Sequence, residues 1–487
     1  MNAPLRRVAV ACLVLFGLLL LNVNYVQVVK AKDYRDDMRN QRVQLRTYER
    51  QRGPIVIGTG AQRISIAKSV KTKDVLTYLR IYPGGAAYAP VTGYYSFLQG
   101  RTGIERLQDR VLSGDDDRLF VRRLSDYVTG NRPSGGAIVL TLQPKAQQAA
   151  YDGLAGKVGA VVALDPRTGA VLAEASRPSY DPSLLSSHDA TQIRATYKSL
   201  SNDPSDPLLN RAVGRTYPPG STFKVITSAA ALAAGVKPTD RIPSPHVLNL
   251  PQTSSTLNNF GGETCGDGTT DTFADALAIS CNTAFGALGI KIGQDAVRKQ
   301  AQAFGFGDDS LQLPQQAAKS IYPDVLTPPQ VAQAAIGQYD VRVTPLQMAM
   351  VAAGVANGGE VMRPYLVQEV QAPDLTTLDA ATPALYRRAV SPAVAAALTA
   401  MMQGVVTSGT GTAAQIPGVA VAGKTGTAQH GPGASPHAWF IGFAPAKDPK
   451  VAVAVLVEDG GSLGSDATGG KVAAPIAKAV MQAVLGR

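Results

Sequence analysis

The sequence predicts an α+β protein in three parts: one N-terminal transmembrane helix, an elongated β-rich segment and a large α+β domain. Two observations predict this. After residue 136, strand patterns stand at both ends of the chain with alanine-rich helical patterns between them, which is typical of one domain whose terminal strands share a sheet. Before residue 136, an apolar run is followed by short stretches in which apolar and polar residues alternate. The 48 Gly and 32 Pro among 487 residues favour many turns and short elements.

The first thirty residues predict a membrane anchor. Arg6 and Arg7 precede an uncharged run from Val8 to Val29, which as a helix would span about 33 Å, enough to cross a hydrocarbon core of about 30 Å. The strictly apolar part, Val8 to Leu21, also suits a cleavable signal peptide. Both alternatives stay open, and we favour a retained anchor because no A-x-A site follows the apolar core. In either case the arginines stay in the cytoplasm and the rest is exported, so we expect a single-pass cell-membrane protein with residues 1–30 as stub and anchor.

The composition limits the classes of partner and cofactor that the chain is expected to bind. A net charge of +11 fits an anionic partner, and export argues against nucleic acid. The few cysteines and histidines exclude a disulfide scaffold and give no metal-ligand spacing, so no metal and no cofactor are expected. These residues are Cys12, Cys265, Cys281, His188, His246, His430 and His437.

Residues 31–135 are predicted to form a pedestal of short strands and turns. Alternation over Arg63–Val70 predicts a strand paired around a turn at Gly58–Gly60. A basic helix is expected from Thr102 onward, and the sequence of Gly130–Gly136 is typical of a linker.

Residues 136–487 are predicted to form the large domain. It would begin with a strand at Ala137–Leu142, a helix at Gln143–Leu154 and a hairpin of Val158–Leu164 and Ala170–Ala175. Helices are then expected at Val225–Ala234, Phe273–Ile290 and Pro345–Ala356, followed by strands at Val419–Gln429, Ala438–Ala444 and Val451–Val457 and a helix at Ala473–Leu485.

Ser221 and Lys224 lie in YPPGSTFKV, where the turn residues end at Gly220 and an apolar helical pattern follows. Ser221 is therefore expected at a helix start, where unpaired N–H groups favour a developing negative charge. Lys224 would lie on the same face, within reach of the serine oxygen. A serine attacks when a base takes its proton, so the lysine must be neutral, and burial and a second lysine would both lower its pKa. The pair predicts a nucleophile with its base.

A second S-x-x-K match occurs at Ser65 and Lys68. It falls in alternating strand sequence without a helix start, and a strand places these two side chains on opposite faces. We interpret it as a chance match.

Two further motifs follow in order. Ser280-Cys281-Asn282 comes after an apolar helical pattern, and its hydroxyl could relay a proton while its amide holds a substrate amide; as a bare tripeptide it also suits helix capping. Lys424-Thr425-Gly426-Thr427 lies in a predicted strand. There the lysine supplies a cation, the threonine hydroxyls bind a carboxylate, and Gly426 lets a substrate approach as an added strand.

S-x-x-K, S-x-N and K-T-G in this order are the signature of penicillin-binding proteins and class A β-lactamases. The chain resembles class B penicillin-binding proteins, most closely the compact actinobacterial penicillin-binding protein A group. Supporting stretches cover nearly the whole chain: RGPI at 52–55, GRTGIERLQDRVLSG at 100–114, NRA at 210–212, AIGQ at 335–338, VTPLQMA at 343–349 and HAWFIGFAP at 437–445. The resemblance implies a penicillin-binding, β-lactamase-like transpeptidase fold, with an antiparallel sheet and helices, in residues 136–487.

The resemblance also implies roles. Ser221 would be the acylated nucleophile, Lys224 the base and Ser280 the proton shuttle. Asn282 would bind the donor peptide, and Lys424 would set the electrostatics of the site. Thr425 and Thr427 would hold the terminal carboxylate of the substrate. The backbone N–H groups of Ser221 and Thr427 would form the oxyanion hole. The implied reaction is D,D-transpeptidation of peptidoglycan stem peptides, with trapping of β-lactam antibiotics. The implied partners are a membrane-embedded glycosyltransferase of the shape, elongation, division and sporulation (SEDS) group and other cell-wall synthesis proteins.

Several alternatives remain at this stage. A β-lactamase would need an acid that activates water, and no E-x-x-x-N pattern lies between Asn282 and Lys424. A D,D-carboxypeptidase shares the acyl-enzyme and uses water as acceptor. A β-lactam-binding sensor normally carries a cytoplasmic signalling part, and the seven residues before Val8 leave no room for one. A scaffold without turnover would be expected to have lost Lys224 or Lys424. Cys265 and Cys281 lie sixteen residues apart in an exported chain, so a disulfide beside the site and two free thiols both remain open.

Overall fold

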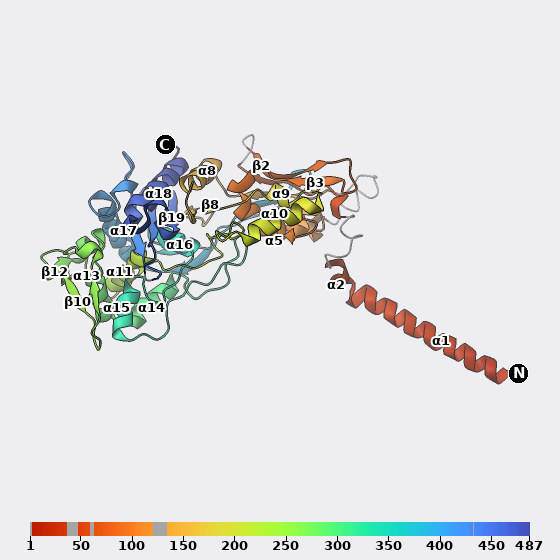
Figure 1. The fold of residues 1–487 in the computed structure, drawn as a ribbon, viewed down its shortest axis with the longest axis horizontal. Helices are drawn as coiled ribbons and strands as arrows, with labels where there is room; N and C mark the ends of the chain where they lie inside the picture. Colours follow the sequence, from red (N-terminus) through yellow and green to blue (C-terminus); the bar gives the residue numbers. More distant parts are fainter. Residues whose placement is uncertain (1, 37–46, 59–62, 120–133, 432) are drawn as a thin grey trace.

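The computed structural model describes residues 2–36, 47–58, 63–119, 134–431 and 433–487. Helix α1 (Asn2–Asn24) continues through a π-helical turn (Tyr25–Val29) to α2 (Ala31–Asp36), and Figure 1 shows it extending away from the rest of the chain. Within it, Ala3–Val29 has a mean hydropathy of 2.2 and is long and apolar enough to cross a membrane. Of the predicted turn at 58–60 and linker at 130–136, residues 59–60 and 130–133 lie outside the described residues.

The sheet of the large domain has five antiparallel strands in the order β17-β18-β19-β7-β8. Strands β7 (Gly159–Leu164) and β8 (Val171–Arg177) form the predicted hairpin. They pair with β17 (Ala422–Ala428), β18 (His437–Ala444) and β19 (Val451–Val457), from the end of the chain. The prediction that the terminal strands of this domain share one sheet is confirmed.

Both faces of this sheet are buried, which explains why its strands are almost continuously apolar. Val453 packs on one face with α18 (Gly469–Leu485), while its neighbour Ala454 packs on the other with α16 (Pro345–Ala356). Figure 1 shows α18 and most of the other helices on different sides of the sheet. The other elements of this domain are α8 (Pro144–Gly153), α9 (Pro182–Leu185), α10 (Ala190–Asn202), α11 (Lys224–Ala233), β9 (Arg241–Pro243), β10 (Val247–Asn249), β11 (Thr256–Asn258), β12 (Thr270–Thr272), α12 (Phe273–Ala278), α13 (Asn282–Ile292), α14 (Gln294–Ala303), α15 (Pro328–Ala335), β13 (Glu360–Met362), β16 (Leu385–Arg388) and α17 (Pro392–Thr407).

The pedestal is built on a second, six-stranded sheet in the order β15-β14-β6-β1-β2-β3. Its strands are β1 (Ile55–Ile57), β2 (Ile64–Lys71), β3 (Tyr78–Ile81), β6 (Ala137–Leu140), β14 (Val367–Gln371) and β15 (Thr377–Ala380). The antiparallel pairing of β1 with β2 confirms the predicted strand pair. The last three strands come from beyond residue 136, so the chain passes between the two parts of the molecule more than once. Shorter elements complete the pedestal: α4 (Ala89–Thr92), β4 (Tyr95–Ser96), β5 (Gly100–Arg101), α5 (Gly103–Leu107) and α6 (Asp109–Leu112).

A buried cluster of charges joins the pedestal elements. The carboxylate of Glu105, on α5, accepts a hydrogen bond from Nε of Arg52 at 2.5 Å and another from Nε of Arg80 at 2.6 Å. All three side chains are at most 5% exposed. Burial alone would raise the pKa of Glu105, but the two guanidinium groups outweigh burial and lower it. Arg52 also donates to Oδ1 of Asp109 at 2.8 Å, so each guanidinium group has a carboxylate partner in an internal salt-bridge network.

Candidate active site

A cleft of about 1050 Å³ lies beside β17, the edge strand of the five-stranded sheet. Its wall includes residues from all three sequence motifs: Ser221, Ser280, Asn282, Thr425 and Thr427. The structure thus brings together segments that are separated by dozens of residues along the chain.

Ser221 lies in a single 3-10 turn, Gly220–Phe223, that leads directly into α11. Gly220 has a φ of +52°, and a Cβ there would come within 2.7 Å of the carbonyl oxygen of Thr427. The N–H of Gly220 also donates to the carbonyl of Gly337 at 2.9 Å. Glycine is therefore required for the serine turn to lie against β17, which brings the backbone of Ser221 close to that of Thr427.

Lys224 is fully buried behind the cleft wall. Its Nζ donates to the carbonyl of Ser280 at 2.6 Å and to Oδ1 of Asn282 at 2.8 Å, and lies 3.4 Å from Oγ of Ser280. Burial lowers the pKa of Lys224 well below its usual value, and the positive charge of Lys424 lowers it further. The lowered pKa favours the neutral amine, which can accept a proton while it is already fixed to the second motif.

The backbone breaks at Ser280, which has a φ of +65°. The prediction of one helix over Phe273–Ile290 is therefore wrong: α12 ends at Ala278 and α13 begins at Asn282. A left-handed residue other than glycine is costly and is kept where the surroundings hold it in place. Here the break directs the Ser280 carbonyl and hydroxyl toward Lys224, which a continuous helix would not do.

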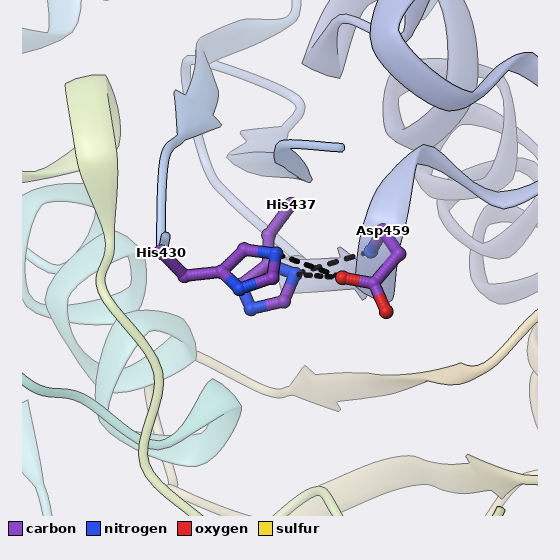
Figure 2. A group of neighbouring side chains, drawn as sticks. All are labelled: His430, His437 and Asp459. Carbon is purple, nitrogen blue, oxygen red and sulfur yellow. Dashed lines mark hydrogen bonds and ion pairs between the residues drawn. The ribbon is translucent and has the colours of Figure 1, made fainter. Parts of the chain in front are cut away.

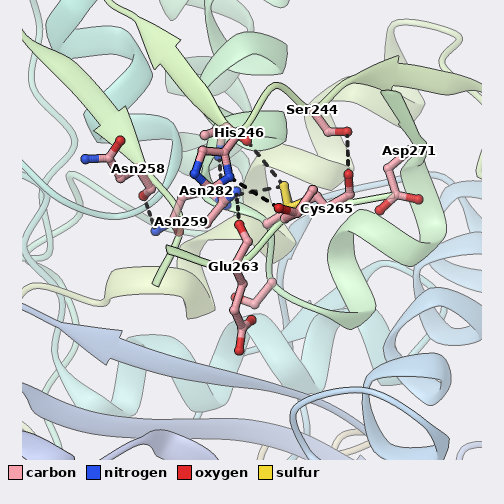
Figure 3. Close-up of a disulfide and its surroundings, with 12 residues drawn as sticks. Ser244, His246, Asn258, Asn259, Glu263, Cys265, Asp271 and Asn282 are labelled. Carbon is pink, nitrogen blue, oxygen red and sulfur yellow. Dashed lines mark hydrogen bonds between the residues drawn. A yellow bond between two sulfur atoms is a disulfide. The ribbon is translucent and has the colours of Figure 1, made fainter. Parts of the chain in front are cut away.

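Asn259 is a residue that the sequence analysis did not single out. Its Oδ1 accepts hydrogen bonds from the N–H groups of Asn282 at 2.8 Å and Thr283 at 3.0 Å, so it caps α13 from more than twenty residues upstream. A disulfide between Cys265 and Cys281 ties the same loop to the S-x-N motif (Figure 3). No local pattern could have revealed the cap, because its two halves meet only through the fold.

Lys424 is the second buried amine of the site. Its Nζ donates to the carbonyl of Thr425 at 3.1 Å, and burial lowers its pKa to about 7. The hydroxyl of Thr425 forms a hydrogen bond with the hydroxyl of Thr410 at 2.6 Å. Thr410, another residue absent from the sequence analysis, thus orients a hydroxyl of the cleft wall.

Gly426 serves packing inside the protein. A Cβ at this position would meet Cγ2 of Thr222 at 2.9 Å, the carbonyl oxygen of Pro219 at 3.0 Å and Cβ of Trp439 at 3.0 Å. The absence of a side chain therefore lets the serine turn and β18 close against β17. The structure thus adds a packing role, and the admission of the substrate at Gly426 stays a prediction.

The loop from β17 to β18 brings two histidines together (Figure 2). The rings of His430 and His437 stack with centroids 3.9 Å apart at 8°. Oδ1 of Asp459 lies 2.8 Å from Nε2 of His430, and the N–H of Asp459 donates to Nδ1 of His437 at 3.1 Å. A metal lies in the plane of each imidazole that binds it, and two parallel stacked rings share no such point. The contacts of this cluster therefore hold the loop in place. Burial lowers the pKa of His437 to about 4, which keeps that ring neutral.

The other S-x-x-K match lies elsewhere. Ser65 and Lys68 are both in strand β2 of the pedestal sheet, as their alternating sequence predicted. Ser65 donates its hydroxyl to the carbonyl of Ala67 at 3.1 Å, and Lys68 is exposed. Neither lines the cleft.

The fold and the three motifs at one cleft define a serine acyltransferase of the penicillin-binding type. Residues 159–482 match the penicillin binding protein transpeptidase domain, and residues 52–138 match the penicillin binding protein A dimerisation domain. The chain belongs to the penicillin-binding protein transpeptidase family.

Similarity to individual proteins supports the same family assignment. The chain is 50% identical to the peptidoglycan D,D-transpeptidase PbpA of Mycolicibacterium smegmatis, over 100% of this chain and 99% of the relative. The structure of penicillin-binding protein A from M. tuberculosis in a ceftriaxone acyl-enzyme complex is 47% identical, with a TM-score of 0.87, over 91% of this chain and 100% of that one. The chain is also 30% identical to the D,D-transpeptidase MrdA of Acinetobacter baumannii, over 80% of this chain and 64% of the relative. The predicted resemblance to class B penicillin-binding proteins and the predicted fold class are confirmed.

Proposed function

We propose that this chain is a monofunctional peptidoglycan D,D-transpeptidase that works through a serine acyl-enzyme and is acylated by β-lactams at the same serine. The observation that carries the proposal is the buried amine of Lys224, which contacts Ser280 and Asn282 behind the wall that Ser221 lines. The relatives, which are D,D-transpeptidases and a protein that forms a β-lactam acyl-enzyme, support it over a β-lactamase, a D,D-carboxypeptidase or a silent sensor.

In the first step, Oγ of Ser221 attacks the carbonyl of the penultimate D-Ala of a stem peptide. Neutral Lys224 takes the hydroxyl proton, and Ser280 passes a proton to the departing D-Ala amine. Backbone N–H groups of Ser221 and Thr427 stabilise the oxyanion. The low pKa of Lys224, caused first by burial and then by Lys424, supports its role as base.

Substrate binding falls to the remaining motif residues. The amide of Asn282 holds the donor peptide, and the hydroxyls of Thr425 and Thr427 hold the terminal carboxylate beside the charge of Lys424. Gly426 acts by letting β17 pack against the serine turn. In the second step an amine of a neighbouring stem attacks the acyl-enzyme, forms the cross-link and returns the proton to Ser221.

The division of the chain follows. Residues 1–30 form a cytoplasmic stub and a single membrane-spanning anchor, 31–135 a pedestal, and 136–487 the transpeptidase domain on the outer side, which also supplies strands β6, β14 and β15 to the pedestal sheet. The apolar helix Ala3–Val29 and the match of residues 52–138 to a dimerisation domain support this organisation. We propose that anchor and pedestal reach a SEDS-type glycosyltransferase and other cell-wall synthesis proteins.

Covalent labelling by a fluorescent penicillin tests the function. We expect label on the purified wild-type chain and on Ser65→Ala, and none on Ser221→Ala. Ser65→Ala is a matched control because it removes the serine of the second S-x-x-K match. An unlabelled wild type, or label that survives Ser221→Ala, would contradict the proposal, and rapid loss of label would favour a β-lactamase.

A further inference from the structure

Two charged side chains line the cleft among the described residues, and they have opposite signs. Lys471 lies in the first turn of α18, where the neighbouring Gly469 packs directly on Gly426 of β17. Glu263 lies on the wall that carries the S-x-N motif. Its side chain is exposed and makes no ion pair with another described residue. A cation that enters the cleft is therefore repelled from the β17 wall and attracted to the opposite one.

An exposed aromatic ring accompanies this carboxylate. Phe260 also lines the cleft and is 56% exposed. It begins the 3-10 turn Phe260–Gly262, and Glu263 is the residue that ends the turn. A phenyl ring and an unpaired carboxylate on the same short segment of the cleft wall complement an aliphatic chain that ends in an ammonium group, because the chain can pack on the ring while the cation meets the charge.

The segment that carries both residues is fixed to the catalytic motif at each end. Before the turn, Asn259 accepts the N–H of Asn282 and donates through Nδ2 to the carbonyl of Glu263 at 3.0 Å. After it, Cys265 is bonded to Cys281, the middle residue of the S-x-N motif (Figure 3). The position of the Phe260–Glu263 segment is thus set relative to Ser280 and Asn282.

We propose that Phe260 and Glu263 form the subsite that docks the amine-bearing side chain of the acceptor stem. This inference rests on the proposed function and concerns only its second half. The acceptor arrives as an alkylammonium ion, which Glu263 attracts and Phe260 supports through the aliphatic part. One proton leaves to solvent as the ion becomes an amine. The amine nitrogen then bonds to the acyl carbon, the ester bond to Ser221 breaks, and the second proton returns to Oγ of Ser221.

The test measures how the acyl-enzyme divides between amine and water. The full chain receives a stem-peptide donor and an acceptor peptide with a lysine-type side chain, and cross-linked and hydrolysed products are counted as acceptor concentration rises. Exposed charge pairs contribute up to about 1 kcal/mol, so Glu263→Gln should raise the acceptor concentration for half-maximal cross-linking about fivefold. Phe260→Ala should act in the same direction. Asp309→Asn removes an exposed acid of the same domain that does not line the cleft, and should change nothing.

A separate readout distinguishes this inference from the function on which it rests. Penicillin acylates Ser221 without an acceptor, so Glu263→Gln should leave the acylation rate within about twofold while partitioning shifts toward hydrolysis. An unchanged partition ratio would overturn the subsite. An equal loss of acylation and cross-linking would also overturn it, because Glu263 would then only support the fold. A wild type that penicillin does not acylate would instead defeat the proposed function.

Discussion

Two clusters of fully buried charge, one in each part of the molecule, are arranged in opposite ways. In the pedestal, Glu105 lies between Arg52 and Arg80, and Arg52 also contacts Asp109, so each guanidinium group has a carboxylate partner. Behind the cleft, Lys224 and Lys424 have like charge, and no carboxylate forms an ion pair with either among the described residues. The pedestal arginines lower the pKa of Glu105 and keep its carboxylate charged, whereas burial in the cleft region lowers the pKa of both lysines and favours their neutral form.

The difference separates a structural use of buried charge from a chemical one. A buried ion pair that is complete fixes the geometry of the elements that supply it, here β3, α5 and the chain before β1. A buried amine without a counter-charge loses its proton easily, which costs stability but provides a base. The motifs RGPI and GRTGIERL therefore contribute charged residues that hold the pedestal elements together. The motifs S-x-x-K and K-T-G contribute the buried amines that serve the reaction.

Removing the base should have the largest effect. Lys224→Met keeps a long unbranched chain but no amine, so we expect the rate of penicillin acylation to fall about 10³-fold, in the range of general base catalysis. Because the lost group was a buried amine without a counter-charge, the melting temperature should change less than for a variant of the pedestal cluster. Stopped-flow acylation and thermal unfolding measure both. An acylation rate within tenfold of the wild type would contradict the assigned role.

Removing the carboxylate of the pedestal cluster should lower the stability of the protein and leave its acylation rate unchanged. Glu105→Gln leaves the buried guanidinium group of Arg80 without a carboxylate partner and that of Arg52 with Asp109 alone, which should lower the free energy of unfolding by about 3–5 kcal/mol. The acylation rate of the folded protein should stay at the wild-type level. Glu49→Gln, which removes an exposed acid of the pedestal, is the control and should change stability little. A large loss of acylation rate in folded Glu105→Gln would show that the two clusters are not separate in function.

How much the sequence could predict follows from the range of the interactions. The hairpin β7–β8 and the strands β17 to β19 have local patterns, and the motifs around Ser221 and Lys424 combine a local pattern with a fixed order. By contrast, β14 joins the pedestal sheet beside β6, more than two hundred residues earlier in the chain. The cap supplied by Asn259 and the left-handed Ser280 likewise depend on partners distant in sequence. Apolar periodicity indicates which residues are buried but not which residues they contact. It therefore predicted one helix over Phe273–Ile290, where the structure has two helices separated at Ser280.

A pH dependence should also separate the two clusters, because their stability contributions titrate in different pH ranges. Lys424 has a pKa of about 7 when folded and 10.5 as its ordinary value, so between these limits the unfolded chain binds the extra proton. Stability therefore rises with pH across this window, by about 1.4 kcal/mol per unit for one proton. The pKa of Glu105 is lowered on folding, so its contribution is present above its ordinary value of 4.5 and is lost as pH falls through the folded value. Urea unfolding between pH 7 and 10 should show a shallower slope for Lys424→Met than for the wild type, while Glu105→Gln keeps the wild-type slope there. Equal slopes for Lys424→Met and the wild type would mean that this lysine stays protonated in the fold, and the contrast between the clusters would fail.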